Sequence, residues 1–409
     1  MLYNLSIWFY WLFVRLASPF HKKAKLMLEG RKNLWPELEA KLQGNTSPVA
    51  WFHCASLGEF EQGRPVIEAF ARQYPDYKIA LSFFSPSGYE VRKNYAGAHY
   101  IFYLPKDSAK NARKLVALLK PKLAVFVKYE FWHYFTQELK TNNVPVISIS
   151  SIFREGQLFF KPYGGFYRNI LRNFSWFFTQ NVHSETLLKS IGITNVSVAG
   201  DTRFDRVLQT AAGVKQIPVV ENFKAGREVF IIGSSWPEDM QVLVPFIKKH
   251  QAELKFIIAP HEIHETEIAK LSSESAGTAI RFSEVANRDL SDYSVLIIDN
   301  IGILSSLYSY SSYAFIGGAF GKGLHNTLEA AVFGLPLFFG PKYQKFQEAR
   351  DLVSLQTAFP VNNLSELETV FENVKKPATK NAIADRQKIY IQEQAGATQK
   401  IMDWISATL

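Results

Sequence analysis

The chain has 409 residues, 47% of them hydrophobic and 20% charged, a composition that excludes a disordered protein and, at this length, predicts two domains. Lys and Arg outnumber Asp and Glu by 46 to 37, giving a formal charge of +9. No nucleic-acid-binding motif accompanies this excess, so it favours an anionic membrane or substrate over nucleic acid. The single cysteine, Cys54, excludes an internal disulfide framework and any multi-cysteine metal site, and it fits the reducing cytoplasm.

Residues 1–30 form an apolar, aromatic segment followed by a basic cluster, and we interpret them as a membrane anchor. A spanning helix needs about 20 apolar residues, and Arg15 interrupts this run, so an anchor lying in the membrane interface is the better interpretation. The basic residues follow the apolar run instead of preceding it, which argues against a signal peptide. A core helix of a soluble domain is the alternative.

Short apolar runs alternate with amphipathic stretches from about Ser47 onward, which predicts buried parallel strands separated by helices. The first set of expected strands is 49–54, 78–84, 99–104, 122–127, 144–149, 176–179 and 196–200. The second set is 227–233, 254–259, 294–299, 313–318, 335–340 and 357–361. The pattern predicts an α/β fold of two Rossmann-like domains with parallel, doubly wound sheets, joined near 205–225, and a ligand cleft at the carboxyl ends of the strands.

Two carboxylates follow strands of the first domain. Ser56 and Gly58 make the turn after the first strand, and Glu59 stands at the helix entrance, where the helix dipole would stabilise its charge. Glu130 is placed equivalently after the 122–127 strand, and Ser85 begins the turn SPSG after the second. Each acid is either an ordinary helix-entry charge or a general base.

The loops of the second domain carry fewer acids. Ser234 and Ser235 follow its first strand, where they can bind phosphate or cap the next helix. His261 and His264 follow the second strand, but their spacing brings at most two imidazoles together, so we expect no metal. The chain has no P-loop, and the late glycine-rich loop lacks the downstream acid of a dinucleotide site, which argues against an NTPase or an ordinary NAD enzyme.

A glycine-rich loop follows the strand that ends near residue 316. Its glycines are Gly317, Gly318, Gly321 and Gly323. Glycine lets the backbone approach a ligand closely, and a short helix expected to open near Asn326 would offer unpaired N–H groups and a partial positive charge, so the loop is typical of a phosphate site. The structural alternative is a helix start of the capping-box kind, made by Asn326 and Glu329.

Six motifs, in this order and spacing, resemble the Kdo transferases, which move 3-deoxy-D-manno-octulosonic acid (Kdo) from its CMP derivative onto the lipid A precursor of lipopolysaccharide. The motifs are ASLGEFEQGRP, SPSGYE, YEFW, GDTRFD, GSSWPEDM and GGAFGKGLHNTLEAAVFGLPLFFGP. The resemblance implies a GT-B architecture. Residues 31–210 would form the acceptor domain and 211–385 the CMP-Kdo domain, with 386–409 forming helices that pack back on the first domain.

The resemblance also implies roles for particular residues. Glu59 looks like the general base, Glu130 like a second acid of the acceptor side, and Asn326 with Glu329 like a CMP-contacting pair. The remaining substrate-binding candidates are Ser56, Gly58, Ser85, Ser234, Ser235, His261, Gly317, Gly318, Gly321, Lys322 and Gly323. The family's arginine near the CMP phosphate is missing, because the chain reads Ala-Pro-His at 259–261, and we expect Lys322 or another cation to replace it.

The expected activity is therefore an inverting glycosyl transfer without metal or cofactor. The expected partners are CMP-Kdo, a lipid A precursor and the inner leaflet of the membrane, and the expected location is the cytoplasmic face of the inner membrane. A sugar-nucleotide epimerase, which shares the cleft and the glycine loop, is the alternative enzyme. A membrane-bound nucleotide or glycolipid binding protein is the non-enzymatic alternative.

Overall fold

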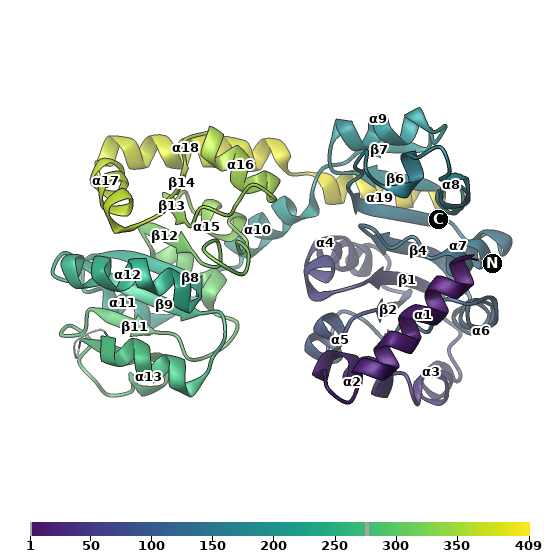
Figure 1. The fold of residues 1–409 in the computed structure, drawn as a ribbon, viewed down its shortest axis with the longest axis horizontal. Helices are drawn as coiled ribbons and strands as arrows, with labels where there is room; N and C mark the ends of the chain where they lie inside the picture. The colour runs from purple at the N-terminus through teal and green to yellow at the C-terminus, as the bar shows by residue number, and fades with distance from the viewer. Residues whose placement is uncertain (1, 275–277) are drawn as a thin grey trace. The chain divides into compact units, whose positions relative to one another are not determined.

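The computed structural model describes residues 2–274 and 278–409. It divides into two units (Figure 1). Unit 1 comprises Met1–Arg206 and Gln394–Leu409, and unit 2 comprises Val207–Glu393. The chain passes from unit 1 to unit 2 within one helix, and its last residues return to unit 1.

Three helices open the chain: α1 (Leu2–Ala17), α2 (Lys22–Glu29) and α3 (Leu34–Leu42). Helix α1 covers most of the expected anchor, whose first residue, Met1, lies outside the described residues. Val14 of α1 is buried against Ala24 and Met27 of α2. In the described part of the chain, no helix combines the length and the apolar character needed to cross a membrane.

Unit 1 contains a seven-stranded parallel sheet in the order β3-β2-β1-β4-β5-β6-β7. Its strands are β1 (Val49–Cys54), β2 (Lys78–Phe83), β3 (Tyr100–Tyr103), β4 (Pro121–Val127), β5 (Val146–Ser151), β6 (Trp176–Thr179) and β7 (Val196–Val198). Its further helices are α4 (Leu57–Gln73), α5 (Pro86–Arg92), α6 (Ala109–Leu119), α7 (His133–Thr141), α8 (Gly165–Leu171), α9 (Val182–Ser190), the connecting α10 (Thr202–Ala212) and α19 (Ala397–Thr408). The chain order reverses between β1 and β4, which is where an open α/β sheet binds ligands.

Unit 2 contains a second seven-stranded parallel sheet, in the order β10-β11-β9-β8-β12-β13-β14. Its strands are β8 (Glu228–Ser235), β9 (Leu254–Pro260), β10 (Ala279–Arg281), β11 (Val295–Ile297), β12 (Tyr313–Ile316), β13 (Leu337–Phe339) and β14 (Ala358–Pro360). Its helices are α11 (Pro218–Lys224), α12 (Pro237–His250), α13 (Glu265–Glu274), α14 (Leu304–Leu307), α15 (Leu328–Ala331), α16 (Gln347–Ser354), α17 (Leu364–Val374) and α18 (Pro377–Gln394). Here the switch point lies between β8 and β12.

The predicted fold class is confirmed for both sheets. Each apolar run interpreted as a strand is a strand close to the expected bounds. One further strand, β10, was not predicted. It has three residues, of which only Ile280 is buried, so the sequence contains no apolar run there.

The last helix belongs to unit 1. Ala397, Ile401 and Ile405 of α19 are buried in the core cluster on one face of the first sheet, together with residues of α4. The carboxylate of Asp205 accepts hydrogen bonds from the backbone N–H groups of Gly396 and Thr398, each at 2.6 Å. An acid that lies nearly 200 residues away along the chain therefore accepts hydrogen bonds from N–H groups that the start of α19 leaves without a partner inside the helix.

Candidate active site

The two candidate acids of unit 1 follow the two strands that flank its switch point. Ser56 is the N-cap of α4, and its side chain accepts from the backbone N–H of Glu59 at 3.5 Å. The carboxylate of Glu59 turns back and accepts from the backbone N–H of Ala55. Two local hydrogen bonds therefore fix Glu59 at the start of α4.

The electrostatic surroundings of Glu59 differ from those of an ordinary helix-entry acid. Burial, and next the negative charge of Glu130, raise the pKa of Glu59 to about 7, although the Ala55 N–H and Lys128 oppose this change. The influence of Glu130 shows that the two acids form one electrostatic group. A carboxylate with a pKa near neutrality is suited to take up a proton during a reaction.

Glu130 contacts two side chains, His53 in strand β1 and Trp132 just before helix α7. Its Oε2 lies 2.9 Å from Nε2 of His53 and 2.7 Å from the indole Nε1 of Trp132. His53 is in β1 and fully buried. Its Nδ1 lies 2.8 Å from Oγ of Ser82, the residue paired with it in β2, and that hydroxyl accepts from the indole of Trp51 at 2.8 Å.

These contacts form one chain of hydrogen bonds with a consistent direction. An ionised Glu130 can only accept, so Nε2 of His53 carries a proton and donates it. The other nitrogen of a neutral imidazole then accepts from Ser82, whose oxygen accepts from Trp51. Sequence reasoning missed His53, Ser82 and Trp132. The available signal was a lone histidine in the otherwise apolar strand VAWFHC.

The two remaining candidates of unit 1 are Ser85 and Gly58, and each lies at the start of a helix. Ser85 is the N-cap of α5, and its Oγ accepts from the backbone N–H of Ser87 at 3.1 Å. Gly58 lies in the first turn of α4, where an added Cβ would meet no atom within 4 Å. Gly58 is therefore not required by sterics within the protein.

The glycine loop of unit 2 forms hydrogen bonds within its own backbone and to Asp239. The N–H groups of its four glycines donate within the protein: Gly317 to Gly233 O at 2.9 Å, Gly318 to Asp239 Oδ2 at 2.8 Å, and Gly321 and Gly323 to Gly318 O at 3.1 and 2.8 Å. These four N–H groups are therefore bonded within the protein, and phosphate binding by the loop stays a prediction. A loop this tight satisfies its own backbone.

Two glycines are nevertheless fixed by close approach. A Cβ on Gly317 would lie 2.2 Å from the carbonyl oxygen of Ser234, and one on Gly318, whose φ is +94°, would lie 2.3 Å from that of Gly323. Asp239 holds the loop against the start of α12, because its Oδ2 also accepts from the backbone N–H of Trp236 at 2.8 Å. Burial raises the pKa of Asp239 to about 6.

The helix after the loop is short, as the sequence predicts. Helix α15 is a single turn of four residues, so it supplies less of the expected helix dipole than a longer helix would. Asn326 lies before it, accepts from the N–H of Leu328 at 3.1 Å and donates to Oε1 of Glu329 at 3.0 Å. Glu329 also helps to raise the pKa of the buried Tyr308. Asn326 and Glu329 thus act as a directly bonded pair.

Three rings cluster at the end of β8. His261 stacks on Trp236 with centroids 4.6 Å apart, and it lies 4.3 Å from the ring of His325. The indole of Trp236 donates to Nε2 of His325 at 3.0 Å. Burial lowers the pKa of His325 to about 4, so this imidazole is neutral and can accept. Sequence reasoning listed His261 but missed Trp236 and His325.

The remaining unit 2 candidates surround this ring cluster. Lys322 is exposed, with its Nζ 5.6 Å from the centre of the Trp236 ring. Ser234 and Ser235 are the last two residues of β8. Neither serine is the N-cap of α12, so the capping alternative is wrong. The N-cap is Trp236, and its backbone N–H donates to Asp239.

Comparisons with known proteins show which family the sequence resembles. Residues 27–206 match the family described as 3-deoxy-D-manno-octulosonic-acid transferase (kdotransferase). The 3-deoxy-D-manno-octulosonic acid transferase of Aquifex aeolicus is 27% identical over 350 residues, covering 84% of this chain and 90% of that protein. The protein of the same name from Chlamydophila psittaci is 26% identical over 369 residues, covering 85% and 82%.

Solved structures resemble the fold. The UDP-GlcNAc 2-epimerase of Neisseria meningitidis has a TM-score of 0.61 at 14% identity, covering 88% of this chain and 100% of that one. Acinetobacter baumannii MurG has a TM-score of 0.57 at 11% identity, covering 88% and 99%. Identities this low show the shared fold alone. Sequence similarity to Kdo transferases therefore extends along most of the chain, and these relatives support a glycosyltransferase.

Proposed function

We propose that the chain transfers Kdo from CMP-Kdo to a hydroxyl of a lipid A precursor, with inversion at the anomeric carbon and Glu59 as the general base. The observation that carries this proposal is the pKa of about 7 of Glu59, raised by burial and by the charge of Glu130 at the β1/β4 switch point. The relatives named as Kdo transferases support the sugar that is moved. The donor and acceptor follow from the motif resemblance.

The chemistry assigned to unit 1 is proton removal. The acceptor oxygen attacks the anomeric carbon, its proton passes to the Glu59 carboxylate, and the bond from that carbon to the CMP phosphate oxygen breaks, so that CMP leaves with the electron pair. Base catalysis of this kind contributes about a hundred- to ten-thousand-fold. Glu130, held by His53 and Trp132, keeps the pKa of Glu59 high and stabilises positive charge that develops at the anomeric carbon.

The chemistry assigned to unit 2 is donor binding. Asn326 and Glu329 would contact the CMP, with Glu329 accepting from the ribose hydroxyls. Lys322 and His261 contact the same Trp236 ring. This shared ring supports Lys322 as the cation near the phosphate, in place of the arginine missing before His261.

We further propose that α1 holds the protein at the cytoplasmic face of the inner membrane. Its apolar side chains are exposed at several positions: Leu2, Leu5, Trp8, Phe9, Phe13 and Leu16. Exposed aromatic rings on one short helix beside basic residues suit the interface between lipid headgroups and acyl chains. This supports an interfacial contact, which needs no spanning helix.

A single reaction tests the activity. Purified protein is incubated in EDTA with a tetraacylated lipid A precursor and with CMP-Kdo that is generated in situ. The mass of the lipid is then measured by mass spectrometry. The expected result is a mass gain of whole Kdo units. A parallel incubation with free sugar nucleotides tests the epimerase alternative. No gain on the lipid, together with epimerisation of a sugar nucleotide, would reject the proposal.

A further inference from the structure

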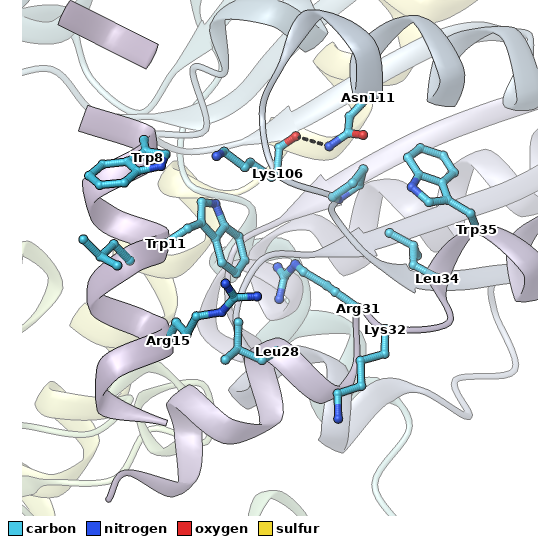
Figure 2. Close-up of a pocket in the computed structure, with 12 residues that line it drawn as sticks. Trp8, Trp11, Arg15, Leu28, Arg31, Lys32, Leu34, Trp35, Lys106 and Asn111 are labelled. Carbon is cyan, nitrogen blue, oxygen red and sulfur yellow. Dashed lines mark hydrogen bonds between the residues drawn. The ribbon is translucent and has the colours of Figure 1, made fainter. Parts of the chain in front are cut away.

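A pocket of about 490 Å³ lies in unit 1 between α1, α3 and the loop after β3 (Figure 2). Its walls include the indole rings of Trp8, Trp11 and Trp35. Its cations are Arg15, Arg31, Lys32 and Lys106, and none of the described residues that line it is an acid. The pocket combines aromatic walls with an uncompensated positive charge.

Arg31 is the most constrained of these cations. Its guanidinium donates to the backbone oxygens of Met27, Phe84 and Leu104 at 2.7–2.8 Å. It also lies 4.9 Å from the centre of the Trp11 ring. Burial lowers the pKa of Arg31 to about 10, which leaves it cationic at neutral pH, and no carboxylate is among the groups that oppose this change. Carbonyl oxygens and aromatic rings hold this guanidinium in place but do not neutralise it, so its charge adds to the positive potential of the pocket.

Two further cations converge on Arg31. Figure 2 shows the Arg15 and Arg31 side chains pointing toward each other beside Trp11, and Lys106 pointing toward Trp8 and Trp11. Neither Arg15 nor Lys106 forms a side-chain ion pair with any described residue. The loop of Lys106 is held in place, because the Asn111 amide donates to its carbonyl oxygen at 2.8 Å. Three cations that line one pocket match a group with several anionic oxygens.

The apolar surface beside the pocket indicates what carries that group. Trp8 and Trp11 line the pocket from α1, and Phe13 of the same helix is 67% exposed. A ligand that is anionic at one end and apolar at the other would satisfy both surfaces. A soluble anion would use only the cations.

We propose that this pocket binds the phosphate group of an anionic lipid whose acyl chains lie along the exposed face of α1. A phosphate offers oxygens to Arg15, Arg31 and Lys106 together, which a single carboxylate of a protein partner does less well.

The pocket also lies near the proposed catalytic acids. The ring of Trp11 contacts that of Phe84, with centroids 6.3 Å apart, and Phe84 contacts Trp132 at 5.0 Å. Trp132 in turn donates to Glu130. A lipid phosphate held here therefore lies two ring contacts away from a residue that holds Glu130. The lipid can be a membrane phospholipid or, if the proposed function holds, the glycolipid acceptor itself.

The test compares two double variants with the same loss of charge. Arg15→Gln with Lys106→Gln alters the pocket, whereas Lys22→Gln with Lys23→Gln alters two exposed lysines of the adjacent α2 that do not line it. The first arm measures binding to phosphatidylcholine vesicles with and without phosphatidic acid and needs no catalytic activity. The second arm measures the KM for a phosphorylated acceptor in neutral detergent.

We expect the pocket variant to bind phosphatidic acid vesicles, or the acceptor, about tenfold more weakly than the control variant, because the pocket cations would contact the phosphate together, whereas the two α2 lysines would attract it only from outside the pocket. A loss in the first arm alone assigns the pocket to a membrane phospholipid. A loss in the second arm alone assigns it to the acceptor phosphate. Equal behaviour of the two variants in both arms overturns the proposal, and unchanged thermal unfolding of both shows that they fold.

Discussion

Nε2 of the fully buried His53 lies 2.9 Å from Oε2 of Glu130, and this contact joins the interior of the first sheet to the edge that carries the two candidate acids. His53 has no access to solvent or substrate, so it acts on the reaction only through Glu130. Glu130 accepts from Nε2 and so fixes the nitrogen that carries the proton, while Nδ1 faces the hydroxyl of Ser82. His53 is therefore a positioning residue in the proposed mechanism.

A double-mutant cycle tests this dependence. His53→Phe keeps an aromatic ring but removes the donor, and we expect kcat to fall about ten- to a hundredfold, as for the loss of other groups that orient a catalytic side chain. In the background of Glu130→Gln the same change should lower kcat little further, because the group that it orients is already altered. His53→Gln, which retains a donor, should restore part of the rate. Additive losses would contradict the positioning role.

The pH dependence of transfer tests Glu59 directly. Since the pKa of Glu59 is about 7 and the base must be ionised, kcat/KM should rise with pH, with its midpoint near that value, and then level off. Glu59→Gln should fold and bind CMP yet transfer about a hundred- to ten-thousand-fold more slowly, without this rise. The measurement is a pH profile of initial rates beside a CMP titration. Near-normal turnover of Glu59→Gln would remove the base assignment.

The same group makes a prediction for stability, with a definite sign. The folded pKa of Glu59, about 7, exceeds its ordinary value of 4.5, so the stability linked to this group is complete below 4.5 and is lost as the pH rises to about 7. Above that pH, the free energy of unfolding of Glu59→Gln should exceed that of the parent by roughly 1–2 kcal/mol, after allowance for partial exposure. The variant should therefore unfold at a higher temperature. Replacing the exposed Glu155 by Gln is the control and should change little. A less stable Glu59→Gln at high pH would contradict the cause given for the raised pKa.

The positions of both acids could be predicted from the sequence for a physical reason. Glu59 and Glu130 each follow a mostly apolar run, and such runs are buried strands whose carboxyl ends share one edge of a parallel sheet. The helix start at Ser56 follows from side-chain chemistry within four residues. Short-range sequence patterns therefore predicted most of the fold and the positions of the two acids in unit 1.

The contacts that adjust these residues could not be predicted in the same way. The pairing of His53 with Ser82 depends on strand register, and its contact with Glu130 joins residues 77 apart in the chain. The glycine loop has a typical phosphate-binding sequence, yet its N–H groups are bonded internally, because only the folded loop shows which carbonyls they reach. The cations around Arg31 were visible only as a basic cluster.

Lys322 gives a prediction for donor binding. If it replaces the missing arginine, Lys322→Ala should raise the KM for CMP-Kdo about tenfold, the cost of one charge-assisted phosphate contact, and change kcat less. Lys345→Ala removes the same charge from an exposed lysine that is outside the cluster of Trp236, His261 and His325, and it should leave the KM within twofold or so. Steady-state rates at varied donor concentration separate the two. Equal KM values for both variants would reject this role of Lys322.

Gly317 and Gly321 allow a matched test of the loop itself. An alanine Cβ at Gly317 would lie 2.2 Å from the backbone oxygen of Ser234, which cannot move without disturbing β8, whereas at Gly321 it would meet only the Glu238 side chain at 3.4 Å. Gly317→Ala should therefore destabilise unit 2 by about 1–3 kcal/mol and weaken CMP binding. Gly321→Ala should stay within about 0.5 kcal/mol of the parent. Thermal unfolding and a calorimetric CMP titration measure both. If the two variants unfold and bind alike, backbone crowding at Gly317 does not shape the donor site.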